Sequence, residues 1–323
     1  MKIIVSQRVA KEYGKRIRAI VPGAGLVSPS AVTGQLRWSG DPANADAALL
    51  SEDMWLDLDS RRLALPAMFG LQDLRWFHTF SAGTDAGAFK AMIERGTVLT
   101  NSSGASAPSI AQHVLAMMLY HTKPIERWRE QQARREWNQL PAGELTGQTC
   151  GIIGTGAIGG EVARLAKAFG MRTVGMRRSA KPARFIDELV SPRRLPYLLR
   201  ASDFVVLACP LTPQTERLIG ERELRAMKPS AVLINVARGR VCDEAALVRA
   251  LGEGWIGGAA LDVFVMEPLP EASPLWMMPN VIVTPHNAGP SPLNMGRVME
   301  IFLDNLARFS ASRRLRNRVN ASV

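Results

Sequence analysis

The sequence has little that would support metal or disulfide chemistry. It contains only three cysteines, Cys150, Cys209 and Cys242, and each stands alone beside an apolar segment. None of them belongs to a Cys-x-x-Cys pair or to a Cys/His spacing typical of a metal site. The pattern therefore predicts buried thiols in a reducing compartment, and no bound metal.

Long hydrophobic runs are also missing. A membrane-spanning helix needs an apolar, uncharged stretch of about 18 residues or more, and the sequence contains none. The amino terminus has Lys2 and a short apolar run, then becomes amphipathic without a small-residue cleavage site, so it is typical of a folded segment and not of a signal peptide. We expect no membrane association and a cytoplasmic location.

The charge balance is basic, with 40 Lys and Arg against 29 Asp and Glu, for a net charge of +11. These basic residues are scattered along the chain and are not interleaved with aromatic residues, which make up only 6%. Such a distribution favours a solvated surface over a nucleic-acid partner. A length of 323 residues with 47% hydrophobic content predicts two globular domains.

Short apolar runs alternate with helical patterns along most of the chain, which indicates parallel sheets covered by helices. Pro108 begins a long helical pattern that continues through Tyr120 and is apolar over much of its surface, as in a buried helix or a subunit contact. Another helix is predicted from Ser291 to Arg308. We predict strands at Ala47–Leu50, Trp76–Phe80, Val98–Leu99, Thr149–Ile153, Arg172–Met176, Phe204–Ala208, Ala231–Asn235, Gly258–Asp262 and Val281–Thr284.

A Gly-x-Gly-x-x-Gly turn lies between the predicted strand at Thr149–Ile153 and a predicted helix at Gly160–Phe169. In this context the pattern is typical of a dinucleotide-binding turn. The first glycine allows the tight turn, the second lets a pyrophosphate approach the backbone, and the third lets the helix pack closely on the strand. The phosphates would then lie at the helix N-terminus. The predicted cofactor-binding residues are Gly154, Thr155, Gly156, Ala157, Ile158 and Gly159.

The end of the next strand distinguishes the two nicotinamide dinucleotides. NAD-binding turns usually have an acidic residue there for the ribose 2′-hydroxyl, whereas this chain has Arg177, Arg178 and Ser179. A guanidinium can pair with a 2′-phosphate that a carboxylate would repel. The sequence therefore predicts NADP(H), with NADPH preferred over NADH.

Only four histidines are available for acid–base chemistry. His113 and His121 lie in the long apolar helix and His78 lies in a predicted strand, so structural roles are expected for all three. His286 differs because it follows the strand at Val281–Thr284, in the kind of strand-end loop where ligands bind in open α/β sheets. It is the candidate acid.

Two further strand-end residues have charges suited to reducing a keto acid. Arg238 offers a cation for a substrate carboxylate. Glu267 offers a carboxylate which, placed beside an imidazole, favours the imidazolium. Spacing alone does not bring Arg238, Glu267 and His286 together, and each is equally compatible with a surface charge or a packed side chain.

Taken in order, several segments resemble those of the D-isomer-specific 2-hydroxyacid dehydrogenases, and most closely the NADP-type glyoxylate/hydroxypyruvate reductases. The resemblance runs from about Ala47 to the C-terminus, and the order and spacing of its segments make it far more specific than the glycine turn alone. The matching segments are Ser81–Asp85, Gly151–Gly159, Pro210–Thr212, Asn235–Gly239, Asp262–Pro268 and Pro285–Gly289.

The resemblance implies a role for each candidate residue. Arg238 would bind the carboxylate and carbonyl of the substrate, His286 would be the acid/base, and Glu267 would pair with His286. The turn formed by Ala82, Gly83 and Thr84 would offer backbone N–H groups to the carboxylate. Asp262 would contact the nicotinamide carboxamide, and the other expected cofactor contacts are Pro210, Thr212, Ala237 and Gly289.

The resemblance also implies the fold and the assembly. We expect an α/β protein with two doubly wound parallel-sheet domains and a cleft between them. Residues 101–287 would form the Rossmann cofactor domain, and residues 1–100 with 288–323 a flavodoxin-like substrate domain. The helix region 108–122 resembles the family's homodimer element.

The chain departs from the family pattern at two positions, and a third bears on the substrate. Gln112 stands where many members have Glu, which affects only a local helix contact, and Arg177 replaces the usual acidic residue. Glu267 stands where formate dehydrogenase relatives have Gln, which favours keto-acid chemistry.

Glyoxylate and hydroxypyruvate are the expected substrates, although the sequence does not size the pocket. Two alternatives remain open: a dehydrogenase of a phosphorylated hydroxy acid, of the phosphoglycerate type, and a nucleotide-sensing, corepressor-like binding protein on the same fold. The second would be expected to have an accessory interaction segment, and we expect no such tail and no regulatory domain after residue 323.

Overall fold

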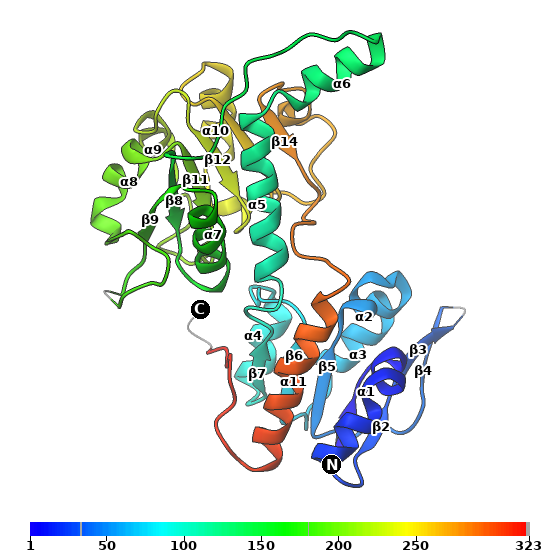
Figure 1. The fold of residues 1–323 in the computed structure, drawn as a ribbon. Coiled ribbons are helices and arrows are strands. Elements are labelled where there is room, and N and C mark those ends of the chain that lie inside the picture. The colour runs from blue at the N-terminus through cyan, green and yellow to red at the C-terminus, as the bar shows by residue number, and fades with distance from the viewer. Residues whose placement is uncertain (33, 180, 321–323) are drawn as a thin grey trace. The chain divides into compact units, whose positions relative to one another are not determined.

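The computed structural model describes residues 1–32, 34–179 and 181–320 (Figure 1). The chain divides into two compact units: unit 1 combines Met1–Ser106 with Ser291–Val323, and unit 2 is Ala107–Pro290. The bounds predicted from the sequence lie a few residues from these. Among the described residues, no helix is long and apolar enough to cross a membrane.

Unit 1 is built on a five-stranded parallel sheet of order β2-β1-β5-β6-β7. With its strands renumbered along the chain, this is the doubly wound order 2-1-3-4-5 of flavodoxin-like folds. The strands are β1 (Lys2–Ile4), β2 (Gly25–Val27), β5 (Ala47–Leu50), β6 (Trp76–Thr79) and β7 (Val98–Asn101). An antiparallel hairpin of β3 (Pro29–Val32) and β4 (Gln35–Trp38) is separate from this sheet.

Alternate residues of the unit 1 strands enter two cores because strand side chains point to opposite faces in turn. Ile3 and Trp76 belong to one cluster, in which Trp76 stacks on Phe302 with 5.2 Å between the ring centroids, while Ile4 and Phe77 belong to the other. The helices of unit 1 are α1 (Gln7–Ile20), α2 (Glu52–Leu56), η1 (Ser60–Ala64), α3 (Leu65–Phe69), α4 (Gly87–Glu94) and α11 (Asn294–Ser310).

Unit 2 is built on a seven-stranded parallel sheet of order β10-β9-β8-β11-β12-β13-β14. Counted along unit 2, the strand order is 3-2-1-4-5-6-7, which is the Rossmann order with one strand added. All strands are parallel, and the point at which the chain begins to add strands on the other side lies between β8 and β11. The strands are β8 (Thr149–Ile153), β9 (Arg172–Met176), β10 (Glu188–Val190), β11 (Phe204–Leu207), β12 (Val232–Asn235), β13 (Gly258–Leu261) and β14 (Val281–Val283).

Helices cover the unit 2 sheet. The predicted long helix is α5 (Ala107–Thr122), which packs against α7 and β12 through small and apolar side chains such as Ala111, Val114 and Met118. It is followed by α6 (Ile125–Arg134), which is labelled in Figure 1. None of the α6 residues is buried. The others are α7 (Ala157–Ala168), η2 (Pro192–Arg194), α8 (Leu195–Ala201), α9 (Glu221–Arg225), η3 (Gly239–Val241), α10 (Glu244–Gly252) and η4 (Pro274–Trp276). The α/β class with two doubly wound parallel sheets is confirmed.

Candidate active site

Three neighbouring strands of unit 2 bring the predicted catalytic residues to one edge of the sheet. Arg238 follows β12, Glu267 follows β13 and His286 follows β14, and these strands are consecutive in the sheet. Because all three are parallel, their carboxyl ends lie along the same edge, which is where ligands bind in open α/β sheets.

His286 and Glu267 are directly paired. The imidazole Nδ1 lies 2.8 Å from Oε2 of Glu267, and both side chains are partly exposed, at 50% and 37%. The other carboxylate oxygen, Oε1, accepts a hydrogen bond of 3.0 Å from the Phe264 N–H, which holds Glu267 in place. Since an ionised carboxylate can only accept, Nδ1 carries a hydrogen, and Nε2 is the nitrogen left to serve a ligand.

The backbone of His286 adopts the left-handed region, with φ of 51°. This conformation is uncommon for a residue with a side chain, so the surroundings must hold it. The His286 N–H donates to the Asp262 carbonyl at 2.9 Å, and Oδ1 of Asp262 accepts from Thr284 Oγ1 at 2.6 Å and from the Asn287 N–H at 2.8 Å. Asp262, predicted from the resemblance to contact the nicotinamide, is 3% exposed and organises the loop that carries His286.

Arg238 is positioned by Asn235 and Gly239. The buried Asn235 side chain accepts from the Ala237 N–H at 3.0 Å and donates to the Arg238 carbonyl at 3.1 Å. It therefore fixes the peptide unit before Ala237 and the peptide unit after Arg238. Gly239 lies so close to the Phe264 backbone that a Cβ atom there would overlap it. Sequence reasoning missed Asn235, although an amide at the end of an otherwise apolar strand is a usable signal.

The glycine turn has the features that a dinucleotide requires. Gly154 has φ of 100°, and a Cβ there would lie 2.7 Å from Cα of Cys209, which follows the neighbouring strand β11. A Cβ at Gly159 would overlap the Gly154 carbonyl, whereas one at Gly156 would meet nothing within 4 Å. The first and third glycines are therefore required by packing, and the second leaves the backbone open to a ligand.

The N-terminus of α7 suits a phosphate. Gly156 is its N-cap, and no side chain caps the first turn, so backbone N–H groups there are available to an anion. The Thr155 hydroxyl is buried and has no hydrogen-bond partner within the part of the chain that the structure describes. These observations fit a pyrophosphate on this turn. No set of three or more potential metal ligands occurs among the described residues.

The remaining predicted cofactor residues follow strands β9, β11, β12 and β14 of the unit 2 sheet, at the carboxyl ends of these parallel strands. Arg177, Arg178 and Ser179 follow β9, and neither guanidinium has an ion pair with a described carboxylate. Pro210 and Thr212 follow β11, where the Thr215 hydroxyl donates to the Pro210 carbonyl at 2.6 Å and accepts from the Thr212 N–H at 2.8 Å. Ala237 and Gly289 lie in the loops of Arg238 and His286.

The predicted carboxylate-binding turn, Ala82, Gly83 and Thr84, belongs to unit 1 and follows β6. His78, on β6 itself, is completely buried, and burial lowers the pKa of its imidazole to about 3. In unit 2, burial lowers the pKa of His121 on α5. His113 also lies on α5, so His78, His113 and His121 all sit within elements of the fold.

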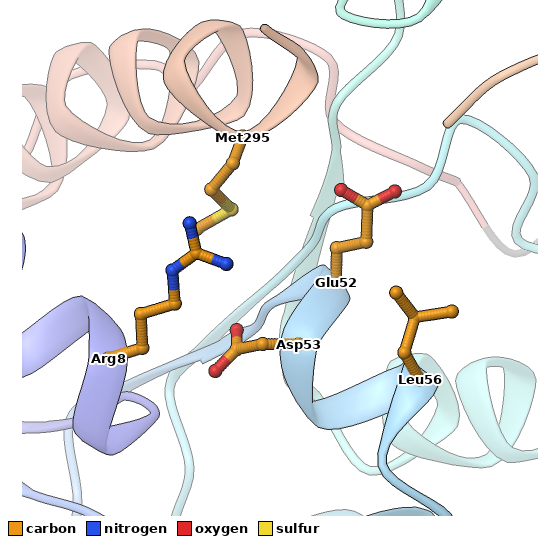
Figure 2. A pocket seen from close by; sticks show the side chains of 5 residues that line it. All are labelled: Arg8, Glu52, Asp53, Leu56 and Met295. Carbon is orange, nitrogen blue, oxygen red and sulfur yellow. The ribbon is translucent and has the colours of Figure 1, made fainter. Parts of the chain in front are cut away.

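Unit 1 contains a cavity of about 280 Å³ that sequence reasoning did not find (Figure 2). Its lining comes from α1, α2 and α11, at the carboxyl ends of β1 and β5. Glu52 projects from α2 in Figure 2, and burial raises the pKa of its carboxyl group, against a hydrogen bond from Asn294 that lowers it. The lining residues are Arg8, Glu52, Asp53, Leu56 and Met295.

Several known proteins are similar to this chain over much of its length. Residues 115–288 match the family model described as "D-isomer specific 2-hydroxyacid dehydrogenase, NAD binding domain". A glyoxylate reductase from Korarchaeum cryptofilum is 38% identical over 257 residues, which is 77% of each chain.

Two solved structures extend the similarity over the whole chain. A D-isomer specific 2-hydroxyacid dehydrogenase from Xanthobacter autotrophicus, in complex with NADPH and MES, has a TM-score of 0.78 at 29% identity, covering 99% of this chain and 98% of its own. An NADPH-dependent glyoxylate/hydroxypyruvate reductase from Sinorhizobium meliloti, in complex with NADP and sulfate, has a TM-score of 0.76 at 26% identity with the same coverage.

Proposed function

Because the chain belongs to the D-isomer specific 2-hydroxyacid dehydrogenase family, we propose that it reduces a small 2-keto acid to the D-2-hydroxy acid with NADPH. One observation carries this proposal: His286 is paired with Glu267 at 2.8 Å. The strands that these two residues follow, β14 and β13, lie next to β12, the strand that Arg238 follows. Glyoxylate and hydroxypyruvate are the proposed substrates, supported by the names of the glyoxylate reductase and glyoxylate/hydroxypyruvate reductase relatives.

The roles of the residues follow from their charges and hydrogen bonds. When bound, NADPH supplies the hydride that adds to C2 of the keto acid. The Arg238 guanidinium binds the substrate carboxylate and stabilises the negative charge that develops on the carbonyl oxygen. His286 donates a proton from Nε2 to that oxygen. Its Nδ1–H remains hydrogen-bonded to Glu267, whose negative charge stabilises the imidazolium before the transfer. Oxidation of the hydroxy acid reverses these steps.

Unit 2 is the proposed cofactor domain and unit 1 the proposed substrate domain. The glycine turn Gly154–Gly159 and the open N-terminus of α7 support pyrophosphate binding in unit 2. In unit 1, the backbone N–H groups of the Ala82–Thr84 turn are the proposed partners of the substrate carboxylate.

The preference for NADPH is proposed from Arg177 and Arg178, which stand where a carboxylate would select NAD. Replacing Arg177 with Asp is expected to raise KM for NADPH by at least about tenfold and to lower KM for NADH, because a carboxylate repels the 2′-phosphate and accepts from a 2′-hydroxyl. Arg193→Asp makes the same charge change on η2 and serves as the control. A wild-type preference for NADH would contradict this assignment.

A panel of 2-keto acids assayed with NADPH, followed at the nicotinamide absorbance band, tests the function. Glyoxylate and hydroxypyruvate are expected to be reduced, and a phosphorylated hydroxypyruvate, included to test the phosphoglycerate-type alternative, to be reduced more slowly. His286→Ala is expected to lower kcat by about 10²–10⁴-fold, whereas His113→Ala, on α5, is expected to leave it near the wild-type value. A fully active His286→Ala variant would overturn the proposal.

We also propose a homodimer formed through residues 108–122 of α5. Supporting side chains include Ile110, Met117 and Leu119, which are apolar and only partly buried. Light scattering of the purified protein is expected to give twice the chain mass of 35.3 kDa, and a monomer at micromolar concentration would contradict this.

A further inference from the structure

The turn after β6 is held by two side chains that bind its carbonyl oxygens. The Ser81 hydroxyl donates to the Gly83 carbonyl at 2.8 Å, and the Asn101 side-chain amide donates to the Ala82 carbonyl at 2.8 Å. Both side chains belong to unit 1, and Asn101 is the last residue of β7, the strand beside β6. Two consecutive peptide units of the turn are therefore fixed by side chains.

This arrangement sets the direction of two N–H groups. In a planar trans peptide, the N–H points away from the C=O of the same unit. The Ala82 carbonyl shares its peptide unit with the Gly83 N–H, and the Gly83 carbonyl shares its unit with the Thr84 N–H. The two hydrogen bonds therefore turn the N–H groups of Gly83 and Thr84 away from Ser81 and Asn101. Neither N–H donates to any residue that the structure describes.

We propose that Ser81 and Asn101 are positioning residues that orient the Gly83 and Thr84 N–H groups toward the substrate carboxylate. This inference rests on the proposed function. Two N–H donors on consecutive residues suit a carboxylate, which has two acceptor oxygens and forms stronger hydrogen bonds than a neutral group. In this arrangement Ser81 and Asn101 act through the turn, because each binds the carbonyl oxygen of a peptide unit whose N–H points the opposite way.

The hydrogen bonds behind Ser81 have one consistent direction. Ser81 has a single hydroxyl hydrogen, which it donates to the Gly83 carbonyl. In the hydrogen bond of 3.1 Å between the hydroxyls of Ser81 and Thr79, Thr79 is therefore the donor. Thr79 is completely buried and its carbonyl accepts from Ser102 Oγ at 2.9 Å. Ser81 is thus held from a rigid strand end and cannot easily turn away from Gly83.

The orientation of the Asn101 amide is fixed as well. Its Oδ1 accepts from the Ser103 N–H at 3.1 Å, which leaves Nδ2 as the group that faces the Ala82 carbonyl. The backbone of Asn101 is held in turn, because its N–H donates to the Asn317 carbonyl at 3.1 Å. An aspartate at 101 would keep the shape and the acceptor but would lose the donor to Ala82.

The test uses oxamate, an unreactive keto-acid analogue, titrated into the enzyme with bound NADPH, together with steady-state kinetics. Ser81→Ala and Asn101→Asp are expected to raise both the oxamate Kd and the KM for the keto acid by about five- to tenfold, with KM for NADPH unchanged. Ser81→Thr retains a hydroxyl and is expected to restore oxamate binding to within about twofold of the wild type.

Two matched controls remove hydrogen bonds of the same kind elsewhere. Ser310→Ala loses a hydroxyl-to-carbonyl bond on α11, and Asn280→Asp loses an amide-to-carbonyl bond in unit 2. Both are expected to bind oxamate as the wild type does. If Ser81→Ala and Asn101→Asp also bind it as the wild type does, or if KM for NADPH rises as much as KM for the keto acid, the positioning role is wrong while the proposed function stands. A wild-type enzyme that neither binds oxamate nor reduces any 2-keto acid contradicts both.

Discussion

Nδ1 of His286 faces Oε2 of Glu267 at 2.8 Å, and the loops that carry the two residues are fixed by separate hydrogen bonds at the ends of β13 and β14. The pairing is therefore set by the backbone positions of the two loops. Exposed ion pairs in general contribute little to stability, so we expect this pair to matter mainly because it orients the imidazole and places a carboxylate beside it.

Glu267→Gln removes the charge and keeps a side chain that can still accept from Nδ1. The protonated imidazole then loses its stabilising partner, so kcat for keto-acid reduction is expected to fall by about 10- to 100-fold near pH 7.5. Steady-state kinetics with the keto acid measure kcat, with Glu253→Gln at the end of α10 as the control. A Glu267→Gln variant with the wild-type kcat would contradict the electrostatic role.

Gly239→Ala is expected to displace the loops that carry the catalytic residues. The added Cβ would overlap the Phe264 backbone, which belongs to the loop between β13 and Glu267, so Arg238 and Glu267 would both shift. Overpacking of this kind typically costs about 1–3 kcal/mol, and kcat/KM is expected to fall by more than about 100-fold.

Gly252→Ala is the matched control for that substitution. A Cβ at Gly252, the last residue of α10, would meet nothing within 4 Å, and alanine favours a helix over glycine. Its melting temperature is expected to equal or exceed that of the wild type, with unchanged kcat/KM. Equal behaviour of the two variants would show that the close approach at Gly239 has no importance.

The sequence predicted most of unit 2 because its signals are local. Buried parallel strands such as Thr149–Ile153 are continuous apolar runs ended by glycine or proline, and this strand and Arg172–Met176 have the predicted bounds. The helix predicted at Gly160–Phe169 starts three residues earlier, at Ala157, because the glycines at its N-terminus lower the helical signal but are tolerated in a first turn.

Unit 1 was less predictable. Strands β1 and β2 have only three residues each and acquire their stability from neighbours far along the chain, which a periodicity cannot reveal. The same limit applies to the site. The residues Arg238, Glu267 and His286 were identified individually, but the hydrogen bonds of Asn235, Asp262 and Asn101 depend on strand order, and no local pattern encodes them.

His78 is expected to make unit 1 sensitive to acid. Its imidazole is fully buried, with Nδ1 2.7 Å from Thr100 Oγ1 and Nε2 2.9 Å from Ser102 Oγ, and burial lowers its pKa from 6.5 to about 3. A lowered pKa means that the unfolded chain binds the proton first. The stability that the neutral imidazole supports is therefore complete above about pH 6.5 and is lost as the pH falls toward 3.

His78→Gln cannot titrate, so comparing it with the wild type isolates this contribution. Its deficit in the free energy of unfolding relative to the wild type is expected to shrink by about 2 kcal/mol between pH 7 and pH 5, at about 1.4 kcal/mol per pH unit below 6.5. Urea unfolding of both proteins at several pH values measures the difference. A deficit that is independent of pH would show that His78 does not titrate in this way.

Glu52, which lines the unit 1 cavity, is expected to change the stability with pH in the direction opposite to His78. Burial raises the pKa of its carboxyl group, so the protonated form is favoured in the folded state. The group favours folding most below its unfolded pKa, and this contribution is lost as the pH rises through the folded pKa; at pH 7 the ionised side chain opposes folding. Because Glu52 is less than half buried, solvent screens much of the effect.

Glu52→Gln removes that charge and retains a side chain able to bond with Asn294. Its melting temperature is expected to exceed that of the wild type by on the order of one or two degrees at pH 7, and the gain should vanish near pH 4, where the wild-type carboxyl is protonated too. Glu94→Gln, at the exposed end of α4, makes the same change without burial and is expected to give no gain. A Glu52→Gln gain that persists undiminished at pH 4 would mean that the improvement comes from packing in the cavity, because by then the charge is absent from both proteins.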